Sequence, residues 1–187
     1  IQVDDRDKET VKLKNGYFQI YTVNKKDKNH VKKQLSSWYR EKADKKFHDR
    51  LGECLEILKK HNISKPKMQV YYMEKRWGSF TASGKVLLNP ELIKHPVYCI
   101  DYVIIHELCH TKHPNHDKEF YDFLKKSINS LIFTNSASWL SRLFTSTASA
   151  AKVLGLPLPG KDSRSGQRPQ ISPRRLPLPG HQKALPS

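Results

Sequence analysis

The sequence predicts an α+β fold in which a small antiparallel sheet packs on a long helix and on a second, more apolar helix. Three observations indicate this class. Apolar residues recur every three or four positions between about residues 29 and 60, short β-rich stretches flank this segment, and a broad apolar face begins near Tyr98. A chain of 187 residues has room for one such domain with its own core, but not comfortably for two.

The first expected elements are a strand and a long helix. The stretch Tyr17 to Tyr21 is β-rich and follows the turn-forming pair Asn15-Gly16, which predicts a strand. From about Asn29 to Lys60 we expect one amphipathic helix or a pair of helices, ended before Pro66, with the apolar positions Val31, Leu35, Trp38, Phe47, Leu51, Leu55 and Leu58. The lysine-rich opposite face is interpreted as a solvated surface rather than a binding site.

A hairpin and the second helix follow. Met68 to Tyr72 and Gly78 to Leu88 are β-rich, with a turn signal at Ser83-Gly84, so we expect these two stretches to build a hairpin. The second helix starts near Tyr98 and continues through the apolar residues Ile100, Val103, Ile104, Ile105 and Leu108. Its apolar face is broad enough to place this helix in the core.

Composition changes after about Leu131. Residues 132–187 hold eight basic residues against one acid, Asp162, and contain Leu-Pro-Leu-Pro-Gly twice. We predict a folded domain over residues 1–131 and a basic, low-complexity, disordered tail over residues 132–187, with a weak amphipathic helix between about 131 and 154. The formal net charge of +16 favours acidic partners such as nucleic acid, but the tail supplies +7 of it (8 − 1).

The three cysteines of the chain bear on its cellular compartment. Cys54, Cys99 and Cys109 do not make a disulfide framework, which favours a reducing, cytoplasmic compartment. Cys99 and Cys109 would lie about 15 Å apart on one helix, so we interpret them as small buried hydrophobic residues. No apolar run approaches the roughly 20 residues of a membrane span. The chain does not begin with methionine, so we expect its N-terminal part to be missing.

The second helix contains the motif His106-Glu107-Leu108-Cys109-His110. At 3.6 residues per turn the two histidines lie about 40° apart on one face, so both imidazoles can bind one cation. In the zincin pattern two such histidines bind zinc, and the adjacent glutamate takes a proton from the zinc-bound water. Ionisable groups in so apolar a helix are costly to bury without a metal. We therefore predict a catalytic Zn²⁺ site here, in preference to histidines that make ordinary hydrogen bonds in a core.

His116 is the predicted third ligand. His113 precedes Pro114, which disfavours helix there and lets the chain turn back towards the metal. His113 itself is less than one turn past His110 and too far round the helix to share its cation. Asp117 is assigned a supporting hydrogen bond that orients a liganding imidazole. Three protein ligands leave one position open for water, which favours catalysis over a structural zinc.

Arg76-Trp77-Gly78-Ser79 admits three interpretations. The segment could be an aromatic and basic contact for nucleic acid, or a strand start at which Trp77 packs and Gly78 permits a turn, and we favour packing. A third interpretation places the following strand at a sheet edge beside the zinc helix, where an extended peptide substrate would pair with it.

Five blocks of residues share an order and spacing with a known family. They are Trp38-Tyr39-Arg40 with Ala43, Lys75 to Ser79, Leu88-Asn89 with Leu92 and Pro96, Ile100 to Val103 before the zinc motif, and Asn115-His116 with Phe120-Tyr121. Together they resemble the YgjP-like metallopeptidase family over about Lys14 to Ser127. That family is similar to the SprT-like and WLM-type zincins, some of which cleave proteins crosslinked to DNA.

The resemblance implies a zincin-like domain with His106, His110 and His116 as zinc ligands and Glu107 as the general base. The chain departs from the family after about Ser127, and the β-rich segment with which members usually begin is absent. A truncated or frame-shifted gene, or a fused unrelated end, would each account for the tail.

Three functions remain open on the sequence. The leading one is a zinc-dependent metallopeptidase, in which zinc-bound water deprotonated by Glu107 attacks a carbonyl of a peptide or protein substrate. Nucleotide pyrophosphate hydrolysis on the same zinc site is an alternative, favoured only by the positive charge, because glycine-rich phosphate cradles are absent. A non-catalytic, basic nucleic-acid-binding module is the third.

Overall fold

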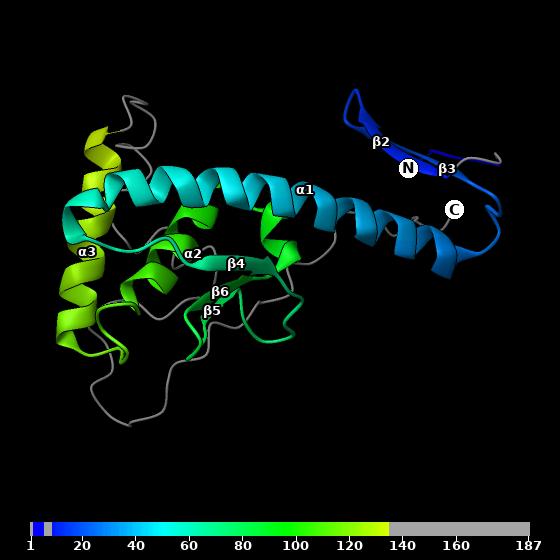
Figure 1. Ribbon diagram of the computed structural model, residues 1–187. Coiled ribbons are helices and arrows are strands. Elements are labelled where there is room, and N and C mark those ends of the chain that lie inside the picture. The colour runs from blue at the N-terminus through cyan, green and yellow to red at the C-terminus, as the bar shows by residue number, and fades with distance from the viewer. Residues whose placement is uncertain (1, 6–8, 135–187) are drawn as a thin grey trace, which may run out of the picture.

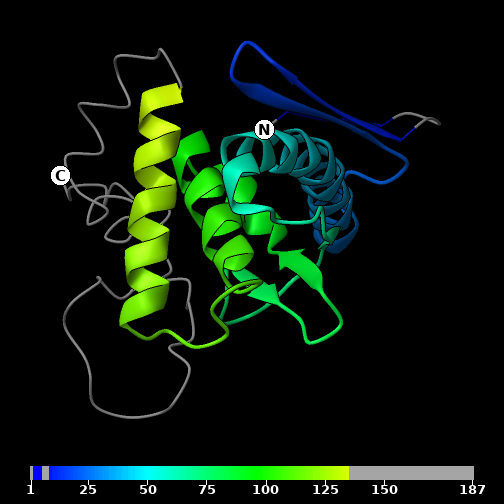
Figure 2. The same cartoon turned by 60° about the vertical axis from the view of Figure 1, so that its left-hand side comes forward.

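The computed structural model describes residues 2–5 and 9–134, which form three α-helices, two short 3-10 helices and two three-stranded sheets (Figure 1). Helix α1 (Lys28–Ile57) runs along the length of these elements, with one sheet at its N-terminal end and the other sheet on the same side as helix α2 (Val97–Cys109). Helix α3 (Lys118–Thr134) packs on α2 (Figure 2). The predicted α+β class is confirmed.

The first sheet has the strand order β1-β3-β2, from β1 (Gln2–Asp5), β2 (Thr10–Lys14) and β3 (Tyr17–Thr22). β2 and β3 are antiparallel, and Asn15 and Gly16 between them have φ values of 51° and 77°, as tight hairpin turns require. β1 pairs with β3 in parallel. Only β3 is predicted from the sequence, whereas the structure places two further strands before Tyr17, where the sequence analysis expects no β-rich segment.

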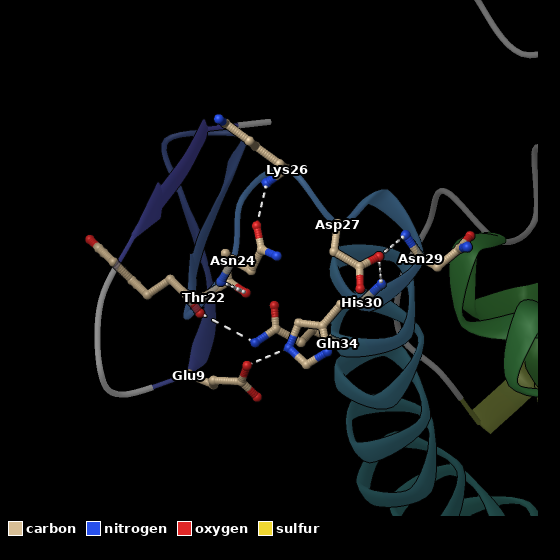
Figure 3. Close-up of polar contacts among 9 residues, drawn as sticks. Glu9, Thr22, Asn24, Lys26, Asp27, Asn29, His30 and Gln34 are labelled. Carbon is tan, nitrogen blue, oxygen red and sulfur yellow. Dashed lines mark hydrogen bonds and ion pairs between the residues drawn. The ribbon is translucent and has the colours of Figure 1, made fainter.

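Helix α1 starts where an aspartate can cap it. The Asp27 carboxylate accepts hydrogen bonds from the backbone N–H groups of Asn29 and His30, each at 3.0 Å (Figure 3). One turn later, Gln34 Nε2 donates to the backbone carbonyl of Tyr21 in β3 at 3.3 Å. These bonds fix the first turns of α1 against the first sheet.

Aromatic contacts complete the attachment of this sheet to α1. The Phe18 ring of β3 meets the rings of Trp38 and Tyr39 edge-on, with centroids 5.2 and 5.5 Å away. At the edge of the sheet, the Glu9 carboxylate pairs with the His30 ring (Figure 3). The predicted apolar face of α1 therefore divides in two, because its first turns cover this sheet and its later turns enter the main core.

The second sheet has the order β4-β6-β5, from β4 (Lys67–Val70), β5 (Gly78–Phe80) and β6 (Lys85–Leu88). β5 and β6 form an antiparallel hairpin that turns at Gly84 (φ 74°). β4 pairs with β6 in parallel. The prediction of an antiparallel sheet with Met68 to Tyr72 in the hairpin is therefore wrong, because residues 71–77 cross to the far side of β6 and β5 returns there.

The main core lies between α1, the second sheet and α2. Residues Cys99 to Cys109 of α2 are all buried, and this helix contacts α1, α3, β5 and β6. Two 3-10 helices connect the parts: η1 (Lys59–His61) follows α1, and η2 (Pro90–Lys94) leads from β6 towards α2. The broad apolar face predicted for the second helix is confirmed as the centre of the fold.

A buried ion pair joins the two central helices. The Arg50 guanidinium on α1 binds the Asp101 carboxylate on α2 through two bonds, of 2.6 Å from Nε and 2.7 Å from Nη2. Such a planar fork fixes the orientation of both side chains. The pair sets the register of α2, which carries the zinc motif, against α1.

Helix α3 is not predicted from the residues, although it buries Phe120, Leu124 and Ile128 at a spacing of four. It extends to Thr134, three residues past the expected domain boundary at 131. The predicted tail and the weak helix over residues 131–154 lie mostly outside the described residues. The boundary, the missing N-terminal part and the disorder of the tail stay predictions.

Candidate metal centre

Helix α2 presents two histidines near its C-terminal end. His106 lies in the last turn and is 5 % exposed, and His110 is the residue at which the helix ends. Their ring centroids are 5.3 Å apart, as expected for residues one turn apart on the same face. The C-terminal end of α2 therefore presents two imidazoles next to the turn that precedes α3. That of His106 is buried and that of His110 is half-buried.

The third histidine comes from that turn. After α2 ends, the chain reverses through Pro114 and reaches α3, which places His116 opposite the end of α2. The Nε2 atoms of His116 and His106 are 2.9 Å apart, and ligand atoms of all three histidines lie within 4.8 Å of one another. The structure thus brings together the three predicted ligands, His106, His110 and His116.

The spacing and chemistry of these nitrogens suit zinc. The Nε2 atoms of His106 and His116, 2.9 Å apart, are near enough to each other to bind one cation. His110 Nδ1 lies 3.1 Å from the backbone carbonyl of His113, a bond that it donates from Nδ1–H, so that Nε2 is the nitrogen of this ring that can bind a metal. The backbone of His113 therefore orients the ring of a candidate ligand.

The buried position of His106 favours the neutral imidazole that a metal needs. Burial, together with the nearby His116 and His110, holds the pKa of His106 well below its usual value. Its Nδ1 atom is buried and has no hydrogen-bond partner among the described residues. The neutral ring is the form that binds a metal, so this low pKa agrees with a cation site at Nε2.

Phe120 on α3 supports the three histidines, and the sequence analysis did not assign it this role. The Phe120 ring is fully buried and lies 4.7 Å from His110, 5.0 Å from His106 and 4.6 Å from His116, measured between centroids. The signal for it in the sequence is only a burial spacing of four with Leu124 and Ile128. The first turn of α3 therefore forms an apolar wall against which the imidazoles pack.

Glu107 is buried beside the histidines, against the second sheet. Its side chain is 2 % exposed, and burial raises the pKa of Glu107 to about 8. The backbone N–H of Phe80 in β5 and the positive charge of Arg76 act in the opposite direction and favour the carboxylate. Both come from the segment 76–80, so β5 and the residues just before it supply the polar surroundings of this carboxyl group.

The structure also places the other residues to which the sequence analysis gave a role. Asp117 caps α3, with its carboxylate accepting a 2.8 Å bond from the Phe120 N–H, which is not the imidazole-orienting role expected for it. Trp77 is 4 % exposed and packs on the His95 ring at 4.8 Å, so the packing interpretation is confirmed.

Cys99 and Cys109 are free and buried, as predicted. β5 is an edge strand in contact with α2, which confirms the position expected for the strand after Trp77.

The comparison with protein families decides the identity of the domain. The model of the YgjP-like family, described as a metallopeptidase domain, matches residues 1–142, which is 142 of 187 residues. The chain belongs to the YgjP-like metallopeptidase family. It is accordingly a hydrolase of the peptidase class, and the resemblance drawn from the sequence blocks is confirmed. Membership of a metallopeptidase family implies a catalytic metal and a peptide or protein substrate.

Two crystal structures of archaeal metallopeptidase zymogens are similar to part of the YgjP-like chain. Pyrococcus abyssi abylysin is 18% identical, with a TM-score of 0.43, and the match covers 58% of this chain and 89% of that chain. Methanocaldococcus jannaschii jannalysin is 21% identical, with a TM-score of 0.37, and the match covers 47% of this chain and 95% of that chain. These TM-scores are too low to support a conclusion about fold or function.

No curated protein matches the chain significantly. Among the described residues there is no helix whose length and apolar character would allow it to cross a membrane. The cytoplasmic location expected from the cysteines stays a prediction.

Proposed function

We propose that this YgjP-like protein is a zinc-dependent metallopeptidase in which His106, His110 and His116 bind the zinc ion and Glu107 is the general base. The observation that supports this assignment best is the convergence of three imidazoles, from two parts of the chain, within 4.8 Å of one another. A buried carboxyl group lies next to them in the sequence and against the sheet edge in space. Three histidines and one glutamate are the set of groups that metal-assisted hydrolysis requires.

The donor set favours zinc over the harder cations. Three neutral imidazoles and no carboxylate ligand suit zinc or a neighbouring transition metal, whereas magnesium and calcium prefer oxygen ligands. When bound, zinc supplies a Lewis acid that polarises a substrate carbonyl and acidifies a water molecule. The protein contributes three ligands and leaves a position open, which is the arrangement of catalytic rather than structural zinc sites.

Glu107 is assigned the proton transfers. Its carboxylate takes the proton from the water molecule that attacks the peptide carbonyl, and then gives this proton to the leaving amine. Because Glu107 is buried, little bulk water is present to take that proton in place of its carboxylate. The Phe80 N–H and Arg76 keep the charged form accessible in this apolar setting.

The edge of β5 is the proposed binding place for the substrate main chain. Trp77 accepts a backbone bond from Asn89, and Thr81 donates one to Lys85, so these alternate residues face β6. In an antiparallel pair the residues between them, Gly78 and Phe80, direct their main-chain groups away from β6. The Phe80 N–H is already used by Glu107, so the Gly78 N–H and the carbonyls of both residues are the groups proposed to bind a peptide. An extended peptide can add to such an edge by main-chain hydrogen bonds, which gives affinity without demanding one side chain.

The decisive experiment combines metal analysis with a protease assay. Purified protein is expected to contain one zinc per chain and to cleave an unfolded protein substrate such as denatured casein, and a chelator should stop cleavage. Glu107→Gln should keep the zinc and reduce kcat by about 10² to 10⁴, because general base catalysis contributes that much. Undiminished cleavage by the zinc-loaded Glu107→Gln variant would show that Glu107 is not the general base.

The two alternatives gain no specific support. Nucleotide pyrophosphate hydrolysis rested on positive charge, and a non-catalytic nucleic-acid-binding module rested on the lysine-rich helices and the basic tail. The separate interpretation of Arg76-Trp77 as a nucleic-acid contact is not supported, because Trp77 is buried. Inclusion of DNA in the protease assay separates the binding module from the main proposal. Binding to DNA that is steeply salt-dependent and indifferent to chelator, without cleavage of protein, would favour the binding module.

A further inference from the structure

Gly78, the first residue of β5, lies directly against the proposed general base. A Cβ atom added to Gly78 would lie 2.7 Å from Oε1 and 2.9 Å from Cγ of Glu107, and 2.8 Å from Cγ1 of Val103. Glu107 and Val103 are both on the buried face of α2 and are 2 % and 0 % exposed. The contact therefore involves the stem of the glutamate as well as its tip, and a small movement of the carboxylate oxygen alone would not make room for a methyl group.

The strand is held too firmly to withdraw from Glu107. Residue 78 is paired with Leu88 in the β5–β6 hairpin, and the Asn89 N–H donates to the Trp77 carbonyl at 2.9 Å. The buried Asn89 amide also donates to the carbonyls of Met73 at 2.6 Å and Arg76 at 2.9 Å. Since Trp77 is itself buried, the residues on both sides of Gly78 are fixed to the second sheet.

The same strand contacts the carboxylate through its main chain. Gly78 and Phe80 face the open edge of the sheet, as the alternation of bonds to β6 requires. The close approach of the Gly78 backbone to Glu107 and Val103 therefore sets the distance between β5 and the glutamate side chain.

We propose that Gly78 is a positioning residue for catalysis: because it lacks a side chain, β5 can lie against α2 and set the place of the Glu107 carboxylate at the metal centre. This inference rests on the proposed function, in that it assumes Glu107 to be the general base. It differs from the turn-permitting role considered from the sequence, because Gly78 is not among the residues of positive φ. The need for glycine at this position is one of space and not of backbone conformation.

The test compares Gly78→Ala with a matched control, Gly52→Ala. Gly52 lies inside α1, and a Cβ atom there would meet nothing within 4 Å, so this variant should keep wild-type kinetics. Gly78→Ala should keep one zinc per chain and a KM within about twofold of wild type. Its kcat should fall about 10²-fold, the effect of misplacing a catalytic group by about 1 Å.

A second variant separates positioning from simple crowding of the core. In Gly78→Ala/Val103→Ala the contact with Val103 is relieved while the contact with Glu107 remains. The double variant should therefore regain thermal stability but not kcat. Recovery of kcat together with stability would overturn the positioning role, and so would a zinc-loaded Gly78→Ala with wild-type kcat.

Crystal structures of the zinc-loaded wild type and of the better-folded of these two variants give a readout that needs no activity. The Glu107 carboxylate should be displaced from the metal centre in the variant, and an unchanged position would overturn the inference. A wild-type protein that binds zinc but cleaves no protein or peptide would refute the proposed function alone. In that case the position of the carboxylate in the two structures still decides the role of Gly78.

Discussion

At the scale of single residues, the metal centre depends on which histidine of the turn after α2 faces the cation. The His116 ring lies 4.6 Å from the His110 ring between centroids, whereas the His113 ring packs on Phe123 at 5.4 Å. His113 contributes to the site through its backbone carbonyl, which accepts a hydrogen bond from His110 Nδ1 and so orients that ring. The two side chains are therefore expected to respond differently to truncation, although they are three positions apart.

His116→Ala should weaken zinc binding by more than about 100-fold, because loss of a ligand exceeds the 10- to 100-fold effect of losing a supporting hydrogen bond. His113→Ala keeps the carbonyl that orients His110, so its zinc affinity should stay within about threefold of wild type. Competition with a chromophoric chelator measures both affinities. The opposite ranking of the two variants would show that the third ligand has been assigned wrongly.

The residues of the site differ in how far the sequence could reveal them. His106, Glu107 and His110 follow from helical spacing alone, and His116 follows from the break that Pro114 imposes. The contact of Gly78 with Glu107 joins residues far apart in the chain, so no local pattern reports it. Asp117 shows the converse, because an aspartate before a helix can cap it or orient a ligand, and only the 2.8 Å bond to Phe120 distinguishes the two roles.

At the scale of elements, the helices were easier to predict than the sheets. The apolar period of α1 and α2 is a local property of each segment, and both helices begin within about a residue of the expected start. Strand direction is not local: β4 runs parallel to β6 because the 71–77 segment crosses the sheet, and the Asn89 amide stabilises that crossing. The β2–β3 hairpin had a local signal in Asn15-Gly16, but the alternation in Thr10 to Lys14 is short.

The Arg50–Asp101 pair gives an element-scale prediction, because it joins α1 to the helix of the zinc motif. Asp101→Ala should lower the free energy of unfolding by about 3 kcal/mol, since among the described residues it leaves a largely buried guanidinium with only the peripheral Glu53 as an acidic partner. Asp44→Ala is the matched control on α1. Its carboxylate is exposed and 3.7 Å from His48, so the loss should stay below about 0.5 kcal/mol.

Urea unfolding of the two aspartate variants, monitored by circular dichroism at one zinc concentration, measures both free energies. A loss below about 1 kcal/mol for Asp101→Ala would mean that packing alone, and not the ion pair, sets the register of α2. An equal loss in both variants would indicate a general effect of net charge.

At the scale of the whole molecule, the proposed metal centre lies where several elements meet. α2 supplies two of the proposed ligands, the turn before α3 supplies the third, and α3 supplies the Phe120 wall. β5 supplies the contacts to Glu107 from the other side. The net charge of +16 does not indicate where this site lies. Residues 132–187 account for +7 of it, whereas the groups of the proposed site lie in the apolar interior of the domain.

Because the ligands come from two parts of the chain, zinc should stabilise the fold as well as the active site. A ligand that binds only the folded state at 100 times its Kd adds about 2.7 kcal/mol to the free energy of unfolding. For a domain of this size that corresponds to a rise in Tm of about 10 °C. Chelation of the purified protein should therefore lower Tm by about this amount, and addition of zinc should restore it.

Hydrogen exchange should place the effect of chelation on the turn and on the first turn of α3, from about His113 to Tyr121, because these residues join α2 through the metal. His116→Ala provides the control, since its Tm should be low already and insensitive to chelator. A wild-type Tm that does not change on chelation, with zinc shown to have left, would mean that packing around Phe120 holds α2 and α3 together without the metal. The histidines would then be a preformed site on a rigid fold, and zinc would contribute to catalysis but not to stability.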